Sequence, residues 1–244
     1  MNAWITGRNP VYECLRANRR HFYQLLVNKG SNQKGRLGEI ISLARQHRVP
    51  IAMADKNRLA DIHENHQGVA LHAGDYPYAD LDAVIHFAKE KQEPLFILAA
   101  DQVQDVQNLG TLIRAAEVFG VHGILIPARR SADVTPAVVN ASSGASEHMR
   151  IVQINLSQAI DQLKEAGAWV VGLDMDQDAR ELASIDLSGN MVIVVGSEGS
   201  GLRRLVREKC DHIAYIPMVG RVDSLNAAVS GSIALYETLK ARKK

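Results

Sequence analysis

Hydrophobic positions in residues 1–74 alternate between two short-range patterns. Residues 34–47 carry apolar side chains at the spacing of one helix face, namely Leu37, Ile40, Ile41 and Ala44. Short apolar runs without that spacing are typical of strands. We therefore predict helices at residues 9–17, 34–47 and 57–62, and strands at 22–27, 49–54 and 68–72.

From residue 95 onward the pattern changes to continuous apolar runs separated by helical segments. Such runs are typical of strands that are buried on both faces of a parallel sheet. We predict strands at residues 95–100, 123–126, 151–154, 169–173, 191–195 and 213–216. Helices are predicted at residues 109–119, 136–145, 157–166, 202–209 and 224–240. This alternation predicts the α/β fold class.

The stretch between these two regions resembles a connector. It contains Pro77 and Pro94 and one predicted helix at residues 81–89. We therefore expect a small N-terminal α/β domain at residues 1–74, a linker at 75–94 and a larger α/β domain at 95–244.

Composition and charge narrow the class of protein. The chain has 244 residues, of which 46% are hydrophobic and 23% charged, and this excludes wholesale disorder. Residues 1–74 hold 11 Lys and Arg against 5 Asp and Glu, whereas residues 75–244 hold 17 against 22. A basic segment suits a polyanion such as nucleic acid, although a solvated basic surface would give the same count.

Cellular location follows from what the sequence lacks. The apolar runs are too short and polar to span a bilayer, and the first residues do not resemble a signal peptide. Cys14 and Cys210 are far apart and form no CxxC motif, which favours a reducing compartment. We therefore expect a cytoplasmic protein with no membrane partner.

Three polar clusters follow predicted strands, where open α/β sheets bind ligands. The first is residues 105–110, in which Asn108 suits a helix N-cap, followed by Arg114. The third is residues 216–229, where Ser224 suits an N-cap and Asn226 is a poor helix former with a side chain available for another role. A capped helix with a surface arginine would explain the first cluster equally well.

The second cluster is the glycine-rich segment 196–201. Its spacing is GxxGxG, which differs from the GxGxxG of dinucleotide-binding folds, and a P-loop GKS or GKT is absent. Glu198 at its tip would repel phosphate, which favours a ligand that is cationic or rich in hydrogen-bond donors. A tight turn that needs glycine for geometry alone is the alternative.

Metal binding is not expected from this sequence. His63-Glu64-Asn65-His66 is not an HExxH motif and has no evident third ligand. Asp174, Asp176 and Asp178 lack the glycine and terminal glutamate of an EF-hand, so we interpret them as a solvated acidic loop.

Together the three clusters resemble the motifs of the SpoU/TrmH family of RNA 2′-O-ribose methyltransferases, in the SPOUT superfamily. The matching segments are NLGxxxRxA at 108–116, VVGSEGxGL at 194–202 and IPMxGxxxSLNxxV at 216–229. Residues 7–11 and 66–70 resemble the family's substrate-binding domain, which is similar to ribosomal protein L30e. The resemblance covers nearly the whole chain. The chain is most similar to bacterial methyltransferases that modify a guanosine ribose in 23S rRNA.

This resemblance implies the fold and the cofactor. The C-terminal domain is expected to contain a deep trefoil knot, to bind S-adenosylmethionine without a metal, and to pair in a homodimer. The cofactor-binding residues implied are Val195, Gly196, Ile216, Met218 and Leu225. The reaction would release S-adenosylhomocysteine.

The resemblance also implies roles for side chains. Arg114 would act on the ribose hydroxyl, supported by Asn108, Glu198, Ser224 and Asn226. RNA contacts are expected from basic residues of the N-terminal domain, namely Arg8, Arg16, Arg19, Arg20, Lys34 and Arg36.

Two positions depart from the family pattern, because Val106 stands where proline is usual and Ala228 where serine is common. We expect neither change to abolish activity. A tRNA methyltransferase of the same family and a non-catalytic RNA-binding or ribosome-assembly protein are the alternative functions.

Overall fold

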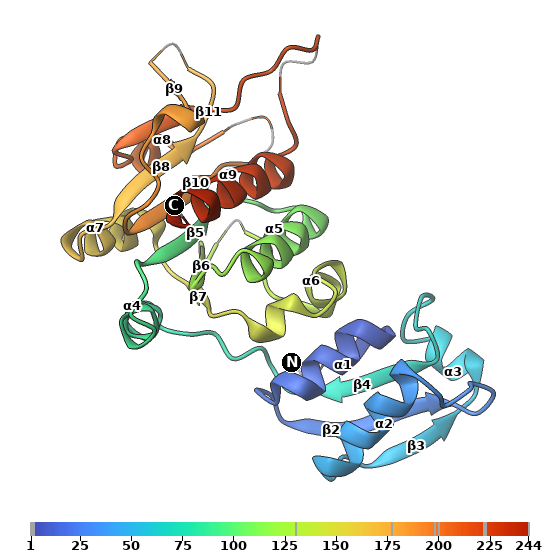
Figure 1. The fold of residues 1–244 in the computed structure, drawn as a ribbon. Helices are drawn as coiled ribbons and strands as arrows, with labels where there is room; N and C mark the ends of the chain where they lie inside the picture. Colours follow the sequence, from blue (N-terminus) through green and yellow to red (C-terminus); the bar gives the residue numbers. More distant parts are fainter. Residues whose placement is uncertain are drawn as a thin grey trace. The chain divides into compact units, whose positions relative to one another are not determined.

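The computed structural model describes residues 3–129, 131–176, 178–197, 199, 201–221 and 224–243. The chain divides into two compact units (Figure 1). The first comprises residues 1–77 together with 133–148, and the second comprises residues 78–132 together with 149–244. A segment from the middle of the sequence therefore belongs to the N-terminal unit.

The first unit contains a four-stranded sheet. Its elements are β1 (Ala3–Thr6), α1 (Arg8–Ala17), β2 (Phe22–Asn28), α2 (Arg36–Gln46), β3 (Ile51–Ala54), α3 (Lys56–Ala60) and β4 (Val69–Ala73). The strand order is β1-β4-β2-β3, in which β4 is antiparallel to both neighbours and β2 is parallel to β3. The short strand β1 was not predicted, because its four residues show no clear alternation of apolar and polar side chains.

Residues 133–148 complete the first unit with α6 (Pro136–Ala141) and the 3-10 helix η1 (Ala145–His148). The predicted helix at 136–145 was therefore too long. It ends early because Ser143 and Gly144 both have positive φ angles. A side chain at Gly144 would place its Cβ 2.7 Å from Cβ of Glu13 on α1, so this close approach requires glycine.

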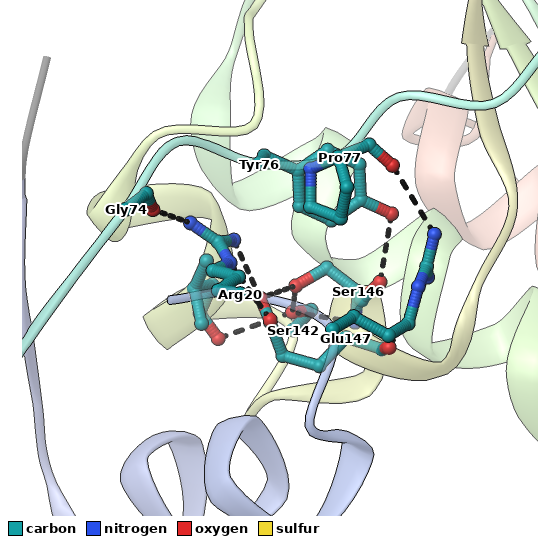
Figure 2. A network of polar contacts seen from close by, with 9 residues as sticks. Arg20, Gly74, Tyr76, Pro77, Ser142, Ser146 and Glu147 are labelled. Carbon is teal, nitrogen blue, oxygen red and sulfur yellow. Dashed lines mark hydrogen bonds and ion pairs between the residues drawn. The ribbon is translucent and has the colours of Figure 1, made fainter. Parts of the chain in front are cut away.

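A buried ion pair joins this segment to the connector between α1 and β2 (Figure 2). Arg20 donates from Nε to Oε2 of Glu147 at 2.9 Å and from Nη2 to Oε1 at 2.6 Å, and its third nitrogen donates to the carbonyl of Gly74. The hydroxyl of Tyr76 donates to the carbonyl of Ser146, and burial raises the pKa of Tyr76 well above its ordinary value. The hydroxyl therefore remains a donor at any physiological pH.

This geometry shows that the predicted RNA contact of Arg20 was wrong, and it gives Arg19 a structural role. The side chain of Arg20 is 3% exposed, so it serves the fold and is not available to RNA. Arg19 is half-buried and donates to the carbonyls of Pro77 and Glu147. Arg16, Lys34 and Arg36 are exposed, as a phosphate contact requires.

The second unit contains a seven-stranded sheet in the order β7-β6-β5-β10-β8-β11-β9. All six neighbouring pairs are parallel, and this confirms the predicted α/β class with a parallel sheet. The strands are β5 (Phe96–Ala100), β6 (Gly123–Ile126), β7 (Ile151–Gln153), β8 (Trp169–Leu173), β9 (Arg180–Glu181), β10 (Met191–Val195) and β11 (His212–Tyr215). The two-residue strand β9 was not predicted.

Helices on both faces of this sheet bury its apolar residues. The helices are α4 (Leu81–Glu90), α5 (Val106–Val118), α7 (Leu156–Glu165), α8 (Arg204–Arg207) and α9 (Ala227–Arg242), with the 3-10 helix η2 (Leu182–Ser184). Helices α4, α7 and α8 share one core cluster with the sheet, and α5 and α9 pack together beside β10 (Figure 1). The segment expected as a linker thus contributes Leu81 and Val84 of α4 to the core of the second unit. The trefoil knot stays a prediction.

Candidate active site

A cavity of about 540 Å³ lies at the carboxyl ends of β8, β10 and β11, which are neighbours in the sheet. The lining residues from the strand ends are Leu173, Asp174, Val195, Gly196, Ala214, Tyr215 and Ile216. The loops and α9 add Met175, Ser197, Gly199, Gly201, Met218, Ser224, Leu225, Asn226, Ala227 and Ser230. A site at this edge is where parallel α/β sheets bind small molecules, and its volume suits one.

The five residues that the resemblance implied for the cofactor all line this cavity. Two of them, Val195 and Gly196, come from the second sequence cluster, and Ile216, Met218 and Leu225 come from the third. Segments about twenty residues apart in the chain thus form one concave surface, because β10 and β11 end at the same edge of the sheet.

The loop after β10 needs glycine for steric reasons. Ser197 and Gly201 exchange two backbone hydrogen bonds, of 3.2 and 3.1 Å, which close the loop into a tight bridge. A Cβ at Gly196 would lie 2.3 Å from the carbonyl carbon of Gly201, closer than any real contact. Only glycine fits at position 196, and because it has no side chain its backbone lines the cavity directly. Glu198 lies outside the described residues.

Asn226 links the N-termini of the two helices that pack together. Its Oδ1 accepts from the backbone N–H of Ala228 at 2.9 Å and of Val229 at 3.2 Å, so it is the N-cap of α9. Its Nδ2 donates to Oδ1 of Asn108 at 2.9 Å. The amide side chain has an acceptor oxygen and a separate donor nitrogen, so each of these two tasks uses its own atom.

Both predicted N-caps were therefore wrong. Asp105 caps α5 by accepting from the N–H of Asn108 at 2.8 Å, and this places Asn108 in the first turn with its side chain turned to Asn226. Ser224 precedes the α9 cap, is exposed and lines the cavity. Aspartate, asparagine and serine are all good caps, so local preference did not separate the neighbours.

Arg114 lies on α5 beyond Asn108. It is exposed and does not line the cavity. The structure thus places Ser224 and Asn226 in the cavity lining and binds Asn108 to Asn226, while Arg114 lies on the exposed surface of the same unit. Its predicted role at the ribose hydroxyl stays a prediction.

Two acidic residues at this edge were missed by sequence reasoning. Asp101 directly follows β5 and is fully buried, and it accepts from the backbone N–H of Arg203 at 2.8 Å and from its Nε at 2.6 Å. This ion pair anchors the chain just after the glycine loop. The available signal was an aspartate at the end of an apolar run.

Asp174 is the second missed residue. It lines the cavity and is the only charged side chain among the described residues that do so. Its Oδ1 accepts from the N–H of Met175 at 2.8 Å, which holds the carboxylate at the end of β8. Its Oδ2 also lies 3.9 Å from Nε of Arg207. The sequence interpretation as a solvated acidic loop did not foresee that this partly exposed carboxylate lines the cavity.

Within the described ranges, no three His, Cys, Asp or Glu side chains gather closely enough to hold a metal ion. None of the helices described in the structure is long and apolar enough to cross a membrane.

The fold and the cavity define an α/β protein that binds a small molecule at the carboxyl edge of a parallel sheet and carries a separate basic unit. Sequence comparison identifies it further. The profile of the SpoU rRNA Methylase family matches residues 95–236, and a profile described as RNA 2′-O ribose methyltransferase substrate binding matches residues 4–79. The chain belongs to the SpoU rRNA methylase family and is an RNA methyltransferase of the SpoU/TrmH type.

Named relatives extend over almost the whole chain. A "Putative TrmH family tRNA/rRNA methyltransferase YacO" of Bacillus subtilis is 38% identical over 98% of this chain and 96% of its own length. An "Uncharacterized tRNA/rRNA methyltransferase" of Mycolicibacterium vanbaalenii is 41% identical over 98% of this chain and 76% of its own.

Solved structures share the fold. The SpoU methyltransferase AviRb from Streptomyces viridochromogenes, in complex with the cofactor AdoMet, superposes with a TM-score of 0.82 at 23% identity, over 99% of this chain and 91% of that one. An AdoMet-bound rRNA methyltransferase from Sinorhizobium meliloti gives 0.81 at 24% identity, over 98% and 87%.

Proposed function

We propose that this protein transfers a methyl group from S-adenosylmethionine to the ribose 2′-hydroxyl of a guanosine in 23S rRNA, acting in the cytoplasm as a homodimer. The observation that carries the proposal is the cavity at the ends of β8, β10 and β11. It gathers residues of two separate family motifs around one negative side chain.

The lining of the cavity fits this cofactor. Its volume of about 540 Å³ is in the range of small-molecule sites. The close approach of Gly196 to Gly201 leaves backbone groups of the glycine loop accessible at the cavity wall. The carboxylate of Asp174 favours a ligand that carries positive charge, and Val195 and Met218 offer apolar contacts to its uncharged parts.

Val195, Gly196, Ile216, Met218 and Leu225 would hold the cofactor, which would supply an electrophilic methyl carbon on a sulfonium. The ribose 2′-oxygen would gain the methyl group, S-adenosylhomocysteine would leave with the electron pair of the broken carbon–sulfur bond, and the hydroxyl proton would pass to solvent. The contribution of this chain is positioning, which supplies much of the rate of such displacements. Asn108 and Asn226 hold the starts of α5 and α9 together at the cavity rim.

We assign Arg114 to orienting the ribose hydroxyl and a neighbouring phosphate. A guanidinium stays protonated in proteins, so it donates hydrogen bonds and does not remove the proton. Glu198 and Ser224 are assigned to holding this constellation and the RNA backbone. The exposed Arg16, Lys34 and Arg36, with the half-buried Arg8, are assigned to phosphates of the substrate.

The substrate is tested by methyl transfer from labelled S-adenosylmethionine to unmodified 23S rRNA and, separately, to unmodified bulk tRNA. We expect label in 23S rRNA at one guanosine. Label in tRNA alone would overturn the proposed substrate while retaining the chemistry. The same assay is repeated with rRNA in precursor particles and with total cellular RNA. If the protein binds the cofactor but transfers no label to any of these RNAs, a non-catalytic protein is favoured.

A further inference from the structure

Four rings form a continuous row on the sheet of the first unit: His21, Tyr23, His72 and Trp4. The rings of Trp4 and His72 are stacked, with centroids 4.7 Å apart and planes 18° apart. Tyr23 lies 4.9 Å from His72, and His21 lies 4.6 Å from Tyr23. We call this set the aromatic row.

The backbone places these rings on one face. Trp4 on β1 is the register partner of His72 on β4, so their side chains are direct cross-strand neighbours. The register between β4 and β2 shifts between Phe22 and Gln24, and Tyr23 is the residue at this irregularity. Such bulges re-aim a side chain, and here Tyr23 reaches the ring of His72.

This face is only partly covered by the protein. Helices α1 and α2 pack together against the sheet, and Leu25 and Leu71, which alternate with the row, are fully buried. The face opposite to α1 and α2 carries the aromatic row. There Leu59 of the short helix α3 covers a small cluster of Leu26, Ala54 and Ala70, and Trp4 packs at the border of that cluster. Beyond it, Tyr23 is 39% exposed and His21 is exposed.

We propose that the aromatic row is a stacking platform for unpaired bases of RNA. Every base has a flat π-face, and aromatic side chains on a sheet bind single-stranded RNA by stacking on it. The basic character of residues 1–74 supplies the complementary charge for the attached phosphates. This inference rests on the proposed function, because it makes RNA the occupant of the face.

The first test reads the fluorescence of Trp4. The chain has two tryptophans, so Trp169→Phe leaves Trp4 as the single reporter. We expect a short unstructured oligoadenylate to quench it, and an abasic oligonucleotide of equal length and charge to leave it unchanged. Equal quenching by both would overturn stacking, because the abasic chain offers phosphates alone. If Trp4 emission changes only with protein concentration, RNA is not the ligand of this face, and the face instead contacts a second copy of the chain.

The second test removes a ring. Tyr23→Leu should weaken oligoadenylate binding by about 5- to 150-fold, the effect of losing one stacked base, and Tyr23→Phe should retain it. Phe22→Leu is the matched control, because it removes a ring from the adjacent position of the same strand, where the side chain contacts His47 instead. Unchanged affinity of Tyr23→Leu for RNA would overturn the platform.

Methyl transfer by the unmodified protein separates the two proposals. If it methylates RNA while Tyr23→Leu binds oligoadenylate normally, the platform is wrong and the proposed function stands. If Trp4 responds to bases but no RNA receives label, the platform is supported and the proposed function is contradicted.

Discussion

At the scale of single residues, the site depends on one amide. Asn226 caps α9 with its oxygen and holds Asn108 with its nitrogen, so helix stability and site geometry share a side chain. Aspartate could cap α9 but has no N–H to donate to Asn108, and serine could cap α9 but is too short to reach Asn108. The two functions of Asn226 are therefore separable by substitution.

Asn226→Ser should keep the cap of α9 and lose the bond to Asn108. We expect thermal stability close to that of the unmodified protein and methyl transfer reduced about 2- to 13-fold, the worth of one hydrogen bond. Asn226→Ala should lose about 1 kcal/mol of unfolding free energy in addition. Thermal melts and methyl-transfer rates check both variants, and full activity of Asn226→Ser would show that the Asn108 bond is not needed.

Sequence reasoning at this scale found the residue types and missed their pairing. The glycine-rich loop and the asparagines stood out because such residues are costly in regular structure unless geometry requires them. Which of Asp105 and Asn108 caps α5 depended on Asn226, which lies 118 positions further along the chain. Asp101 drew no attention, and Asp174 was interpreted only as part of a solvated acidic loop, because an acidic residue after a strand is common in loops.

At the scale of elements, the buried pair of Arg20 and Glu147 holds η1 to the connector between α1 and β2. Two charged hydrogen bonds and the carbonyl of Gly74 satisfy the guanidinium away from water. Burial raises the pKa of the neighbouring Cys14 thiol, and the charge of Glu147 raises it further, so this cysteine is not a reactive thiolate. The network fixes the segment 133–148 within the first unit.

Glu147→Gln should destabilise the first unit, because it leaves the charge of Arg20 buried without a counter-charge. The expected loss is about 3–5 kcal/mol of unfolding free energy, measured by urea denaturation. The double variant Arg20→Met/Glu147→Leu should recover much of this loss, since apolar residues of similar volume replace both charges. Equal stability of Glu147→Gln and the unmodified protein would contradict the account.

This element-level arrangement was beyond sequence pattern. The helix at 136–145 was predicted from its apolar residues, but its early end depends on Glu13, against which Gly144 packs. Arg20 was counted as a surface cation, because nothing local to residue 20 indicates that Glu147 is its partner.

At the scale of the whole molecule, α5 and α9 present an uncovered apolar face. Val118, Val229 and Tyr236 are 65%, 45% and 48% exposed, and Phe119 contacts the ring of Tyr236. The buried side of α9 is formed by other residues, among them Gly231, Ala234 and Leu235. The exposed apolar residues are therefore the expected contact surface of the proposed homodimer.

Tyr236→Glu should shift the proposed homodimer to monomer, because it places a charge in this apolar face. Sedimentation at several protein concentrations measures the shift. Leu205→Glu is the control, since Leu205 is 56% exposed on α8, which packs with the opposite face of the sheet. A dimer that survives Tyr236→Glu would contradict this interface.

The order of strands and helices in the large unit followed from hydrophobic pattern, because buried parallel strands must be apolar throughout. The membership of residues 133–148 in the first unit did not, since it depends on contacts between segments far apart in sequence. From the sequence, only the location of the cavity at the carboxyl edge of the sheet could be predicted. That the carboxylate of Asp174 lines it became evident from the structure.

The proposed function requires methylation at the ribose 2′-oxygen. The most direct test is alkaline hydrolysis of RNA labelled by this protein, because a methylated 2′-oxygen prevents attack on the adjacent phosphate. The account predicts that the label appears in an alkali-stable dinucleotide whose 5′ residue is guanosine, and that Arg114→Ala abolishes it while S-adenosylmethionine still binds. Label released as a mononucleotide with a methylated base would contradict the account.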